Sequence, residues 1–299
     1  MSTSRTTQEQ KWTVLSLVRW ATSFLAEREI ENARLEVERM LAHVLGVDRV
    51  GLYLQFDRPL NERELRAFRE LLRRRARREP LAYVLGEWEF FGLRLKVDRR
   101  VLVPRPETER VAEVCLDILE TEREVRFLDL GTGSGNLAAA IAVHRPLARG
   151  WAIDVSKEAA ELARENLRAL GVADRVHVAV ADMRRAPFPI AKGDRGYDLV
   201  VSNPPYVRPE EWPTLQKEIT NYEPRQALVA EPDGLSYHRA VARVASHVLK
   251  PGGAVVVEIG ADQAGEVCAI LRSQGLEQIQ VVRDLGGRDR VVSARKALP

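Results

Sequence analysis

Apolar side chains recur every three to four residues through much of residues 10–78, a spacing that predicts amphipathic helices. One helical run is expected to stop at Gly46, because glycine commonly terminates helices. Another is expected to begin after Asn61, since Asn61 and Glu64 have the spacing of a capping box. This helix runs into the arginine-rich segment 73–78. We interpret that segment as a solvated helix end, with a surface that faces a partner as the alternative.

The pattern changes beyond residue 80. Apolar residues cluster on both sides of Gly92, which predicts a short β-hairpin with its turn near that glycine. From about residue 125 onward strands and helices alternate, which predicts a mostly parallel sheet covered by helices on both faces. The last two strands are separated only by a short segment at 285–287, so they should form an antiparallel hairpin. Strands are expected at 125–130, 150–154, 175–180, 197–202, 253–259, 277–282 and 290–295, and helices at 136–144, 157–170, 235–249 and 262–273.

These patterns divide the chain into three parts. Residues 1–79 form a small helical domain, residues 80–104 a β-hairpin connector, and residues 105–299 a doubly wound α/β domain. The length of 299 residues is sufficient for about two domains. With 45% hydrophobic and 30% charged residues, the composition is that of a globular protein, which excludes a disordered chain.

The compartment is inferred from what the chain lacks. No apolar run approaches the ~18 residues that a transmembrane helix needs, and the first residues lack the apolar core of a signal peptide. Two cysteines cannot build a disulfide framework, and the histidines show no metal-ligand spacing. We therefore expect a cytoplasmic protein without a metal site or a membrane association.

Charge changes this picture only slightly. The net charge is +3, and residues 1–80 hold 16 basic and 12 acidic side chains, a net of +4. The remainder holds 30 basic and 31 acidic side chains, a net of −1. This small basic excess weakly favours a polar or anionic partner for the helical part.

A glycine-rich turn follows the first predicted strand of the α/β domain. In a parallel sheet, ligands bind at the carboxyl ends of the strands, and glycines allow the backbone to approach a ligand closely. Asn136 stands where a nicotinamide fingerprint requires its third glycine, which disfavours a nicotinamide oxidoreductase. The spacing instead resembles motif I of class I S-adenosylmethionine-dependent methyltransferases, although a purely structural turn is the alternative. The turn consists of Gly131, Thr132, Gly133, Ser134 and Gly135.

Acidic residues follow the next two strands. Asp154 closes the second strand, where a carboxylate can accept hydrogen bonds from both hydroxyls of a ribose. The alternative is that Asp154 caps the helix that opens near Lys157. Asp182 and Met183 follow the third strand, and we expect Asp182 to face the amine of an adenine ring and Met183 to pack near that ring.

The tetrapeptide Asn203-Pro204-Pro205-Tyr206 ends the fourth strand. Its prolines stiffen the turn, and the Asn203 side-chain oxygen and the Pro204 carbonyl supply two neighbouring acceptors. Two acceptors match the two N–H bonds of a planar NH2 group, whose nitrogen is a poor nucleophile because its lone pair is delocalised. Holding both bonds directs the lone pair toward a sulfonium methyl group, and Tyr206 can pack over the planar group. The chemistry predicted from the residues is methyl transfer to an NH2 group.

Further segments resemble one family over about residues 30 to 295, the release factor glutamine-N(5) methyltransferases. The similar segments are 79–92, 103–109, 223–228, 233–235 and 289–292. The resemblance implies methylation of the glutamine in the Gly-Gly-Gln motif of peptide chain release factors, with the helical domain and the hairpin helping to hold the factor. It also implies that the loop Gly131–Gly135, Asp154, Met183 and Asn203 contact S-adenosylmethionine, and that residues 203–206 hold the glutamine side chain.

Two other functions are open. A DNA or RNA amino-methyltransferase would use the same tetrapeptide on a flipped base, but the near-neutral charge of the α/β domain gives no sign of the basic groove that such an enzyme would carry, and we expect no stable nucleic-acid binding. A cofactor-binding regulator without catalysis would need no acceptor pair for an NH2 group, so the intact tetrapeptide argues against it.

Overall fold

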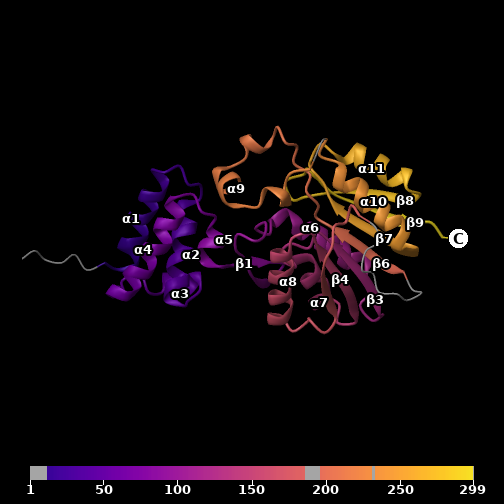
Figure 1. The fold of residues 1–299 in the computed structure, drawn as a ribbon. Coiled ribbons are helices and arrows are strands. Elements are labelled where there is room, and N and C mark those ends of the chain that lie inside the picture. Colours follow the sequence, from indigo (N-terminus) through magenta and orange to yellow (C-terminus); the bar gives the residue numbers. More distant parts are fainter. Residues whose placement is uncertain (1–11, 186–195, 231–232, 299) are drawn as a thin grey trace, which may run out of the picture. The chain divides into compact units, whose positions relative to one another are not determined.

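The computed structural model describes residues 12–185, 196–230 and 233–298. The chain divides into two compact units, Met1–Leu85 and Gly86–Pro299 (Figure 1). No helix in the described part of the chain is both long and apolar enough to cross a bilayer.

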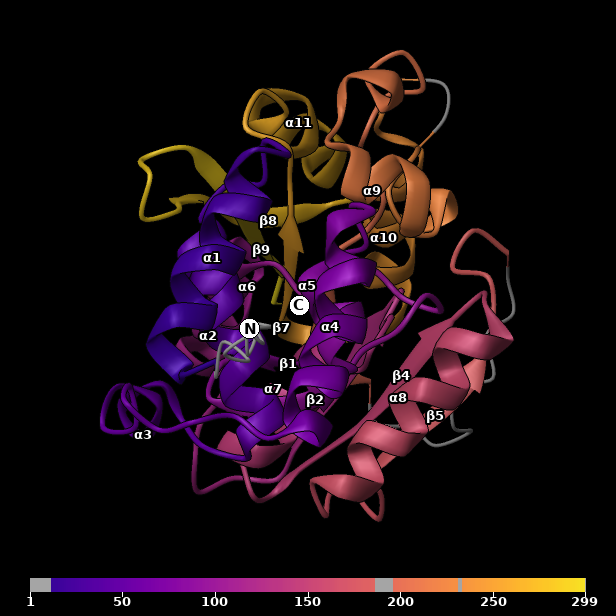
Figure 2. The same cartoon turned by 90° about the vertical axis from the view of Figure 1, so that its left-hand side faces the viewer.

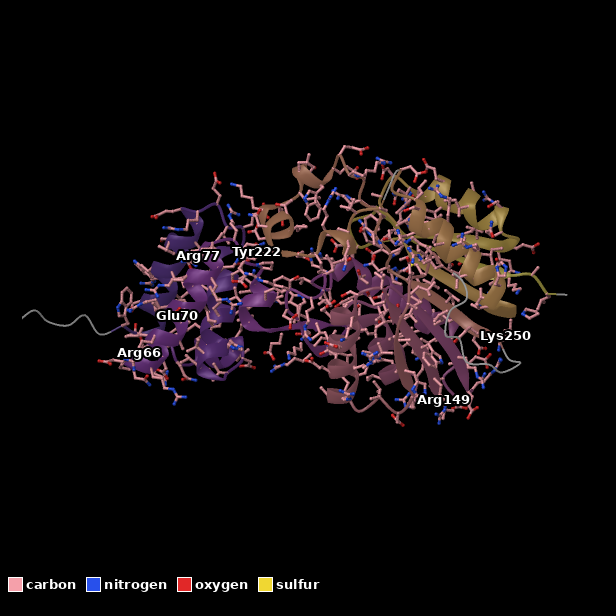
Figure 3. All side chains as sticks on the ribbon, in the orientation of Figure 1. Arg66, Glu70, Arg77, Arg149, Tyr222 and Lys250 are labelled. Carbon is pink, nitrogen blue, oxygen red and sulfur yellow. The ribbon has the colours of Figure 1, made fainter. Side chains whose placement is uncertain are left out.

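The first unit is helical, as its apolar spacing predicts. The Asn61 side chain accepts a hydrogen bond from the backbone of Glu64 and the Glu64 carboxylate accepts one from the backbone of Asn61, which confirms the capping box. Gly46 ends the second helix in a left-handed conformation with a φ of 66°. Arg66 and Glu70 are exposed on α4 (Figure 3). The helices described are α1 (Val14–Ala26), α2 (Ala33–Leu45), α3 (Arg49–Tyr53), α4 (Glu62–Ala76) and α5 (Leu81–Leu85).

The arginine-rich segment 73–78 contributes to the packing of this unit. Arg75 is only 4% exposed, and its guanidinium pairs with the Glu36 carboxylate on α2. Arg74 pairs with Glu79 and also donates to two backbone carbonyls of α5. The interpretation of the segment as a solvated helix end is therefore wrong for Arg75. A buried guanidinium needs a paired carboxylate, and no local pattern indicates that Glu36, 39 residues earlier, lies next to Arg75.

A β-hairpin opens the second unit, as predicted. Strand β1 (Glu87–Phe90) pairs antiparallel with β2 (Leu93–Lys96). Phe91 and Gly92 form the turn, and both have a positive φ. The Phe91 backbone N–H donates to the Glu109 carboxylate at 2.8 Å, which ties this turn to α6 (Pro106–Ile118).

The main sheet of the second unit has seven strands in the order β5-β4-β3-β6-β7-β9-β8. Strands β3 to β7 pair in parallel, whereas β9 pairs antiparallel with both β7 and β8. This confirms the mostly parallel sheet with an antiparallel terminal hairpin. Strand β7 begins at Leu249 rather than at residue 253. The strands are β3 (Val125–Leu130), β4 (Ala148–Asp154), β5 (Val176–Val180), β6 (Tyr197–Ser202), β7 (Leu249–Glu258), β8 (Leu276–Arg283) and β9 (Asp289–Lys296).

Helices cover the sheet on both faces (Figures 1 and 2). Leu128 and Leu130 of β3 belong to the core under α10 and α11. Because side chains alternate along a strand, Phe127 and Asp129 point to the opposite face, where α6, α7 and α8 pack together. The remaining helices are α7 (Asn136–His144), α8 (Lys157–Ala169), η1 (Trp212–Thr214), α9 (Lys217–Tyr222), η2 (Arg225–Ala227), α10 (Ser236–Val248) and α11 (Ala264–Ser273).

Close packing of β3 against β4 generates a stability prediction. Gly150 pairs with Phe127, and a Cβ at Gly150 would lie 2.5 Å from the Phe127 ring, which is fully buried. We expect Gly150→Ala to lower the free energy of unfolding by about 1–3 kcal/mol, the usual cost of overpacking a core. The urea midpoint, followed by far-ultraviolet circular dichroism, measures the loss.

The matched control is Gly265→Ala in α11. A Cβ there meets no atom within 4 Å, and alanine favours helix over glycine. Its midpoint should stay the same or rise slightly. Equal midpoints for the two variants would show that the Phe127 ring moves aside without cost.

Candidate active site

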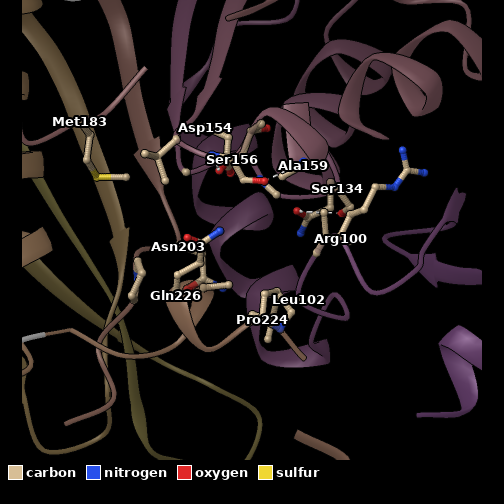
Figure 4. Close-up of a pocket in the computed structure, with 18 of the residues that line it drawn as sticks. Arg100, Leu102, Ser134, Asp154, Ser156, Ala159, Met183, Asn203, Pro224 and Gln226 are labelled. Carbon is tan, nitrogen blue, oxygen red and sulfur yellow. Dashed lines mark hydrogen bonds between the residues drawn. The ribbon is translucent and has the colours of Figure 1, made fainter. Parts of the chain in front are cut away.

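A pocket lies at the carboxyl ends of the central strands of the second unit. Its walls come from the glycine turn after β3, the end of β4, the residues after β5 and the segment after β6, together with residues before α6 and around η2. Figure 4 shows Asp154 and Asn203 on its walls, with Met183 toward one end and Arg100 toward the other. The strand order reverses between β3 and β6, which is where open α/β sheets bind ligands.

The glycine turn needs glycine for two different reasons. Gly131, Gly133 and Gly135 all have positive φ angles, of 73°, 54° and 81°, a region that other residues adopt at a cost. At Gly131 a Cβ would also lie 3.0 Å from the terminal methyl carbon of Met183, so its absence makes room for that side chain. At Gly135 it would press on Ala163 of α8. Gly135 thus serves helix packing and lies outside the pocket lining, which contains the other four residues of the turn.

Asp154 is held by two backbone amides. Its Oδ2 accepts from the Gly133 N–H and its Oδ1 from the Ser156 N–H, both at 2.9 Å. The cap of α8 is Ser156, whose Oγ accepts from the Ala159 N–H, so the capping role considered for Asp154 is wrong. Burial raises the pKa of the Asp154 carboxyl, although the amide donors oppose that shift. Each oxygen keeps a lone pair for a further donor in the pocket.

Asp182 and Met183 lie in the pocket wall after β5. Both Asp182 oxygens accept from the Arg184 guanidinium at 3.0 Å, and this partner lowers the pKa of Asp182. Met183 is 6% exposed and packs into the core beneath the pocket. The pair therefore offers an ionised carboxylate beside an apolar surface.

The segment after β6 reaches the pocket with Asn203 and Pro205, whereas Pro204 and Tyr206 lie outside the described lining. Asn203 Nδ2 donates to Thr108 Oγ1 at 3.0 Å. Because the amide nitrogen points to α6, the amide oxygen is the end directed away from it. Tyr206 donates its hydroxyl to the buried Glu258 carboxylate at 3.1 Å.

Sequence reasoning missed several residues that hold these parts together. Asn166 of α8 bonds the backbone of Lys96 in the hairpin and donates to the Ser134 carbonyl in the glycine turn. Glu223 is 6% exposed and accepts from the Val103 N–H and the Arg105 guanidinium. Thr108 and Glu258 stand behind Asn203. Thr108 and Glu223 lie in the segments that resemble the family, 103–109 and 223–228, but nothing in the sequence gives their partners. Glu258 had a signal of its own, as a carboxylate at the end of an apolar strand.

The sheet order, the glycine turn after its central strand and the acid after the next strand define a class I methyltransferase fold. Sequence comparison agrees: residues 16–86 match the PrmC N-terminal domain family and residues 106–225 match the methyltransferase small domain family. The chain belongs to the release factor glutamine methyltransferase family.

Similar proteins support this placement. The chain is 43% identical to the release factor glutamine methyltransferase of Chlorobaculum tepidum, covering 96% of this chain and 98% of the relative. It is 41% identical to that of Geobacter sulfurreducens, covering 97% and 99%. Among solved structures, a methyltransferase from Pyrococcus furiosus shares the fold, with a TM-score of 0.50 and 17% identity over 70% of this chain and 91% of that one.

A buried carboxylate under the glycine turn makes stability depend on pH. Asp129 is fully buried, and its Oδ2 accepts from the Thr132 hydroxyl at 2.6 Å. Burial raises its pKa to about 7. The folded protein therefore binds a proton that the unfolded chain has released between about pH 4 and pH 7. This group stabilises the fold fully below about pH 4 and loses that contribution as the pH rises through 7.

We expect the free energy of unfolding of Asp129→Asn to fall less between pH 4.5 and pH 8 than that of the unaltered protein. The difference should be roughly 4 kcal/mol at most, given the pKa shift. Urea titrations at several pH values measure both slopes. Parallel pH dependences would mean that Asp129 is ionised in the folded protein throughout this range.

Proposed function

We propose that this chain transfers the methyl group of S-adenosylmethionine to the side-chain amide nitrogen of the glutamine in the Gly-Gly-Gln motif of peptide chain release factors. Relatives named release factor glutamine methyltransferase match it over nearly their whole length. The observation that carries the proposal is the position of Asn203, which follows β6 directly beside the glycine turn after β3. An acceptor for an NH2 group and a cradle for the cofactor thereby share one pocket.

The donors and acceptors of this pocket fit S-adenosylmethionine. The oxygens of Asp154 suit the two ribose hydroxyls, the glycines leave room beside the turn, and Met183 offers an apolar surface to the adenine ring. When bound, the cofactor supplies an electrophilic methyl group on a sulfonium sulfur. The proposed cofactor residues are Gly131, Thr132, Gly133, Ser134, Asp154, Asp182, Met183 and Asn203, together with Gly135, which lies outside the pocket lining and would act by shaping the turn.

The residues after β6 are assigned to the substrate amide. We assign Asn203 Oδ1 and the Pro204 carbonyl as acceptors of hydrogen bonds from its two N–H groups, which would direct the nitrogen lone pair toward the methyl group without prior removal of a proton. The nitrogen would gain the methyl group as the carbon–sulfur bond of the cofactor breaks, and would then lose one of its two protons. Orientation of this kind can contribute several kcal/mol to the barrier reduction. Pro205 and Tyr206 complete the substrate-holding segment, with Asn203, Pro204 and Tyr206 as the catalytic group.

The helices before the catalytic unit receive the recognition role. Residues 1–79 carry none of the cofactor motifs, so a substrate-holding domain accounts for them, with residues 80–104 as connector and residues 105–299 as methyltransferase domain. The enzyme would act in the cytoplasm, where release factors serve translation. Metal, membrane and nucleic acid have no part in the proposed reaction.

Mass spectrometry of an intact release factor, incubated with the enzyme and S-adenosylmethionine, tests the function directly. The expected product carries one added methyl group on the Gly-Gly-Gln glutamine. DNA and RNA oligonucleotides provide the comparison arm. Methylation of an oligonucleotide and not of the release factor would overturn the proposal.

Asn203→Ala should abolish most of the turnover and leave most of the S-adenosylmethionine affinity intact, because the glycine turn and Asp154 remain. Loss of one oriented hydrogen-bonding group in a transition state costs about 100-fold or more in kcat. Single-turnover methylation gives the rate, and calorimetry gives the cofactor affinity. A rate within about threefold of the unaltered enzyme would refute the role of Asn203.

Asp154→Ala should weaken cofactor binding by about tenfold or more, because hydrogen bonds to a charged acceptor contribute about 1.5–3 kcal/mol each. The matched control is Glu161→Ala, which removes a half-exposed carboxylate from α8 outside the pocket lining. Calorimetry compares the dissociation constants. An unchanged affinity in Asp154→Ala would leave Asp154 with a purely structural role.

A further inference from the structure

A buried carboxylate stands directly behind the pocket wall. Glu258 ends β7, is 1% exposed, and accepts from Thr108 Oγ1 at 2.6 Å through Oε2. Thr108 lies in α6 and is also 1% exposed. Its oxygen in turn accepts from Asn203 Nδ2 at 3.0 Å. Three side chains therefore form an unbroken hydrogen-bonded series from the core to the pocket.

The single hydrogen of the threonine hydroxyl gives this series a direction. An ionised carboxylate can only accept hydrogen bonds, so the Thr108 hydroxyl must donate its hydrogen to Glu258. The lone pairs of the Thr108 oxygen then face Asn203, and only the NH2 end of the amide can satisfy them. The two ends of a carboxamide are almost equal in size, so shape alone would not prefer one orientation over the other.

The orientation matters because the proposed substrate presents two N–H donors. With Nδ2 toward Thr108, Oδ1 is free to accept one of them. In a reversed Asn203 amide, the Nδ2 donors would face the N–H donors of the substrate, and Oδ1 would no longer be there to accept from them.

We propose that Thr108 and Glu258 are positioning residues that set the direction of the Asn203 amide, so that Oδ1 and not Nδ2 faces the substrate nitrogen. This inference rests on the proposed function and adds two residues to it, Thr108 in the pocket lining and Glu258 behind it, both of which are proposed to act through Asn203.

Protonation of Glu258 would remove the preference for one orientation of the Asn203 amide. A protonated carboxyl can donate to Thr108, whose own hydrogen is then free to turn toward Asn203 and stabilise the reversed amide. Burial raises the pKa of Glu258 to about 7, which places this change within a testable range. Beside Thr108, the groups that face Glu258 are the Tyr206 hydroxyl, the Arg290 guanidinium, the Glu107 carboxylate and His238, whose Nε2 bonds the Glu258 carbonyl oxygen.

The properties of these neighbours indicate that Glu258 itself is the group that gains a proton near pH 7. Arg290 and the two hydroxyl donors hold its pKa down, whereas Glu107 adds to the upward shift caused by burial. Burial raises the pKa of Tyr206 and lowers that of His238, so Tyr206 stays protonated and His238 stays neutral around pH 7. We therefore expect kcat to fall as the pH drops through about 7.

The experiment measures kcat, KM for an intact release factor and the cofactor dissociation constant in the full chain. Thr108→Val keeps the shape of the side chain and removes the hydroxyl, and should lower kcat by about 10- to 100-fold, the equivalent of one hydrogen bond to a charged network. KM and cofactor affinity should change by less than about threefold. Thr108→Ser restores the hydroxyl and should recover most of kcat.

Glu258→Gln and Tyr197→Phe complete the set. Glu258→Gln should lower kcat and abolish its decline in acid. Tyr197→Phe removes a hydroxyl from a buried side chain at the opposite end of β6 from Asn203, and should leave kcat within about twofold.

The outcomes separate the inference from the function on which it rests. An unaltered enzyme that methylates no release factor overturns both. An active enzyme whose Thr108→Val variant keeps its kcat, or whose Glu258→Gln variant keeps the acid decline, overturns the positioning role alone. If Thr108→Val fails to fold, the pH profile of the unaltered enzyme decides, because a kcat that is constant from pH 8 to pH 5.5 contradicts the inference without any variant.

Discussion

The parallel pairing of β3 with β6 sets Leu130 opposite Ser202, and the Ser202 hydroxyl donates to the Leu130 carbonyl at 2.7 Å. The residues that follow are Gly131 after β3 and Asn203 after β6, which the proposed function assigns to the cofactor and to the substrate amide. A shift of this register by one residue would turn the side chains to the other face of the sheet and separate the glycine turn from the amide. Asp154 is positioned in turn by the pairing of β3 with β4, and Asp182 and Met183 by the pairing of β4 with β5.

Two buried carboxylates lie close to that pairing, and the burial of each lowers the stability of the fold when it is ionised. Asp129 lies beneath the glycine turn and Glu258 behind Asn203, and burial raises the pKa of each to about 7. Each accepts a short hydrogen bond from a threonine, Thr132 or Thr108. A buried charge that is only partly satisfied destabilises a core. Two such carboxylates, Asp129 near the end of β3 and Glu258 at the end of β7, are consistent with a site that holds its polar groups in one orientation. This arrangement lowers the stability of the core.

The sequence predicted the parts of this site that are local. The end of β3 and the end of β6 could be predicted because apolar strands run directly into Gly131 and Asn203, and the cap at Asn61 because its partner is three residues away. The contact of Thr108 with Glu258 joins residues 150 positions apart, and that of Glu36 with Arg75 joins two helices. Hydrophobic periodicity carries no information on such pairs, because it predicts which face is buried and not which polar groups meet there.

An acceptor pair for an NH2 group does not by itself choose between glutamine and an amino base, since both present the same two N–H bonds. Discrimination must then come from surfaces beyond Asn203. Proteins that bind nucleic acid through its backbone offer lysines and arginines to neutralise phosphates. In this chain the densest arginine segment, 73–78, engages its charges internally: Arg73 pairs with Glu70, Arg74 with Glu79, and Arg75 with Glu36. Arg74 and Arg75 therefore contribute to the packing of the helical unit, Arg74 through the carbonyls of α5 and Arg75 through its buried pair with Glu36.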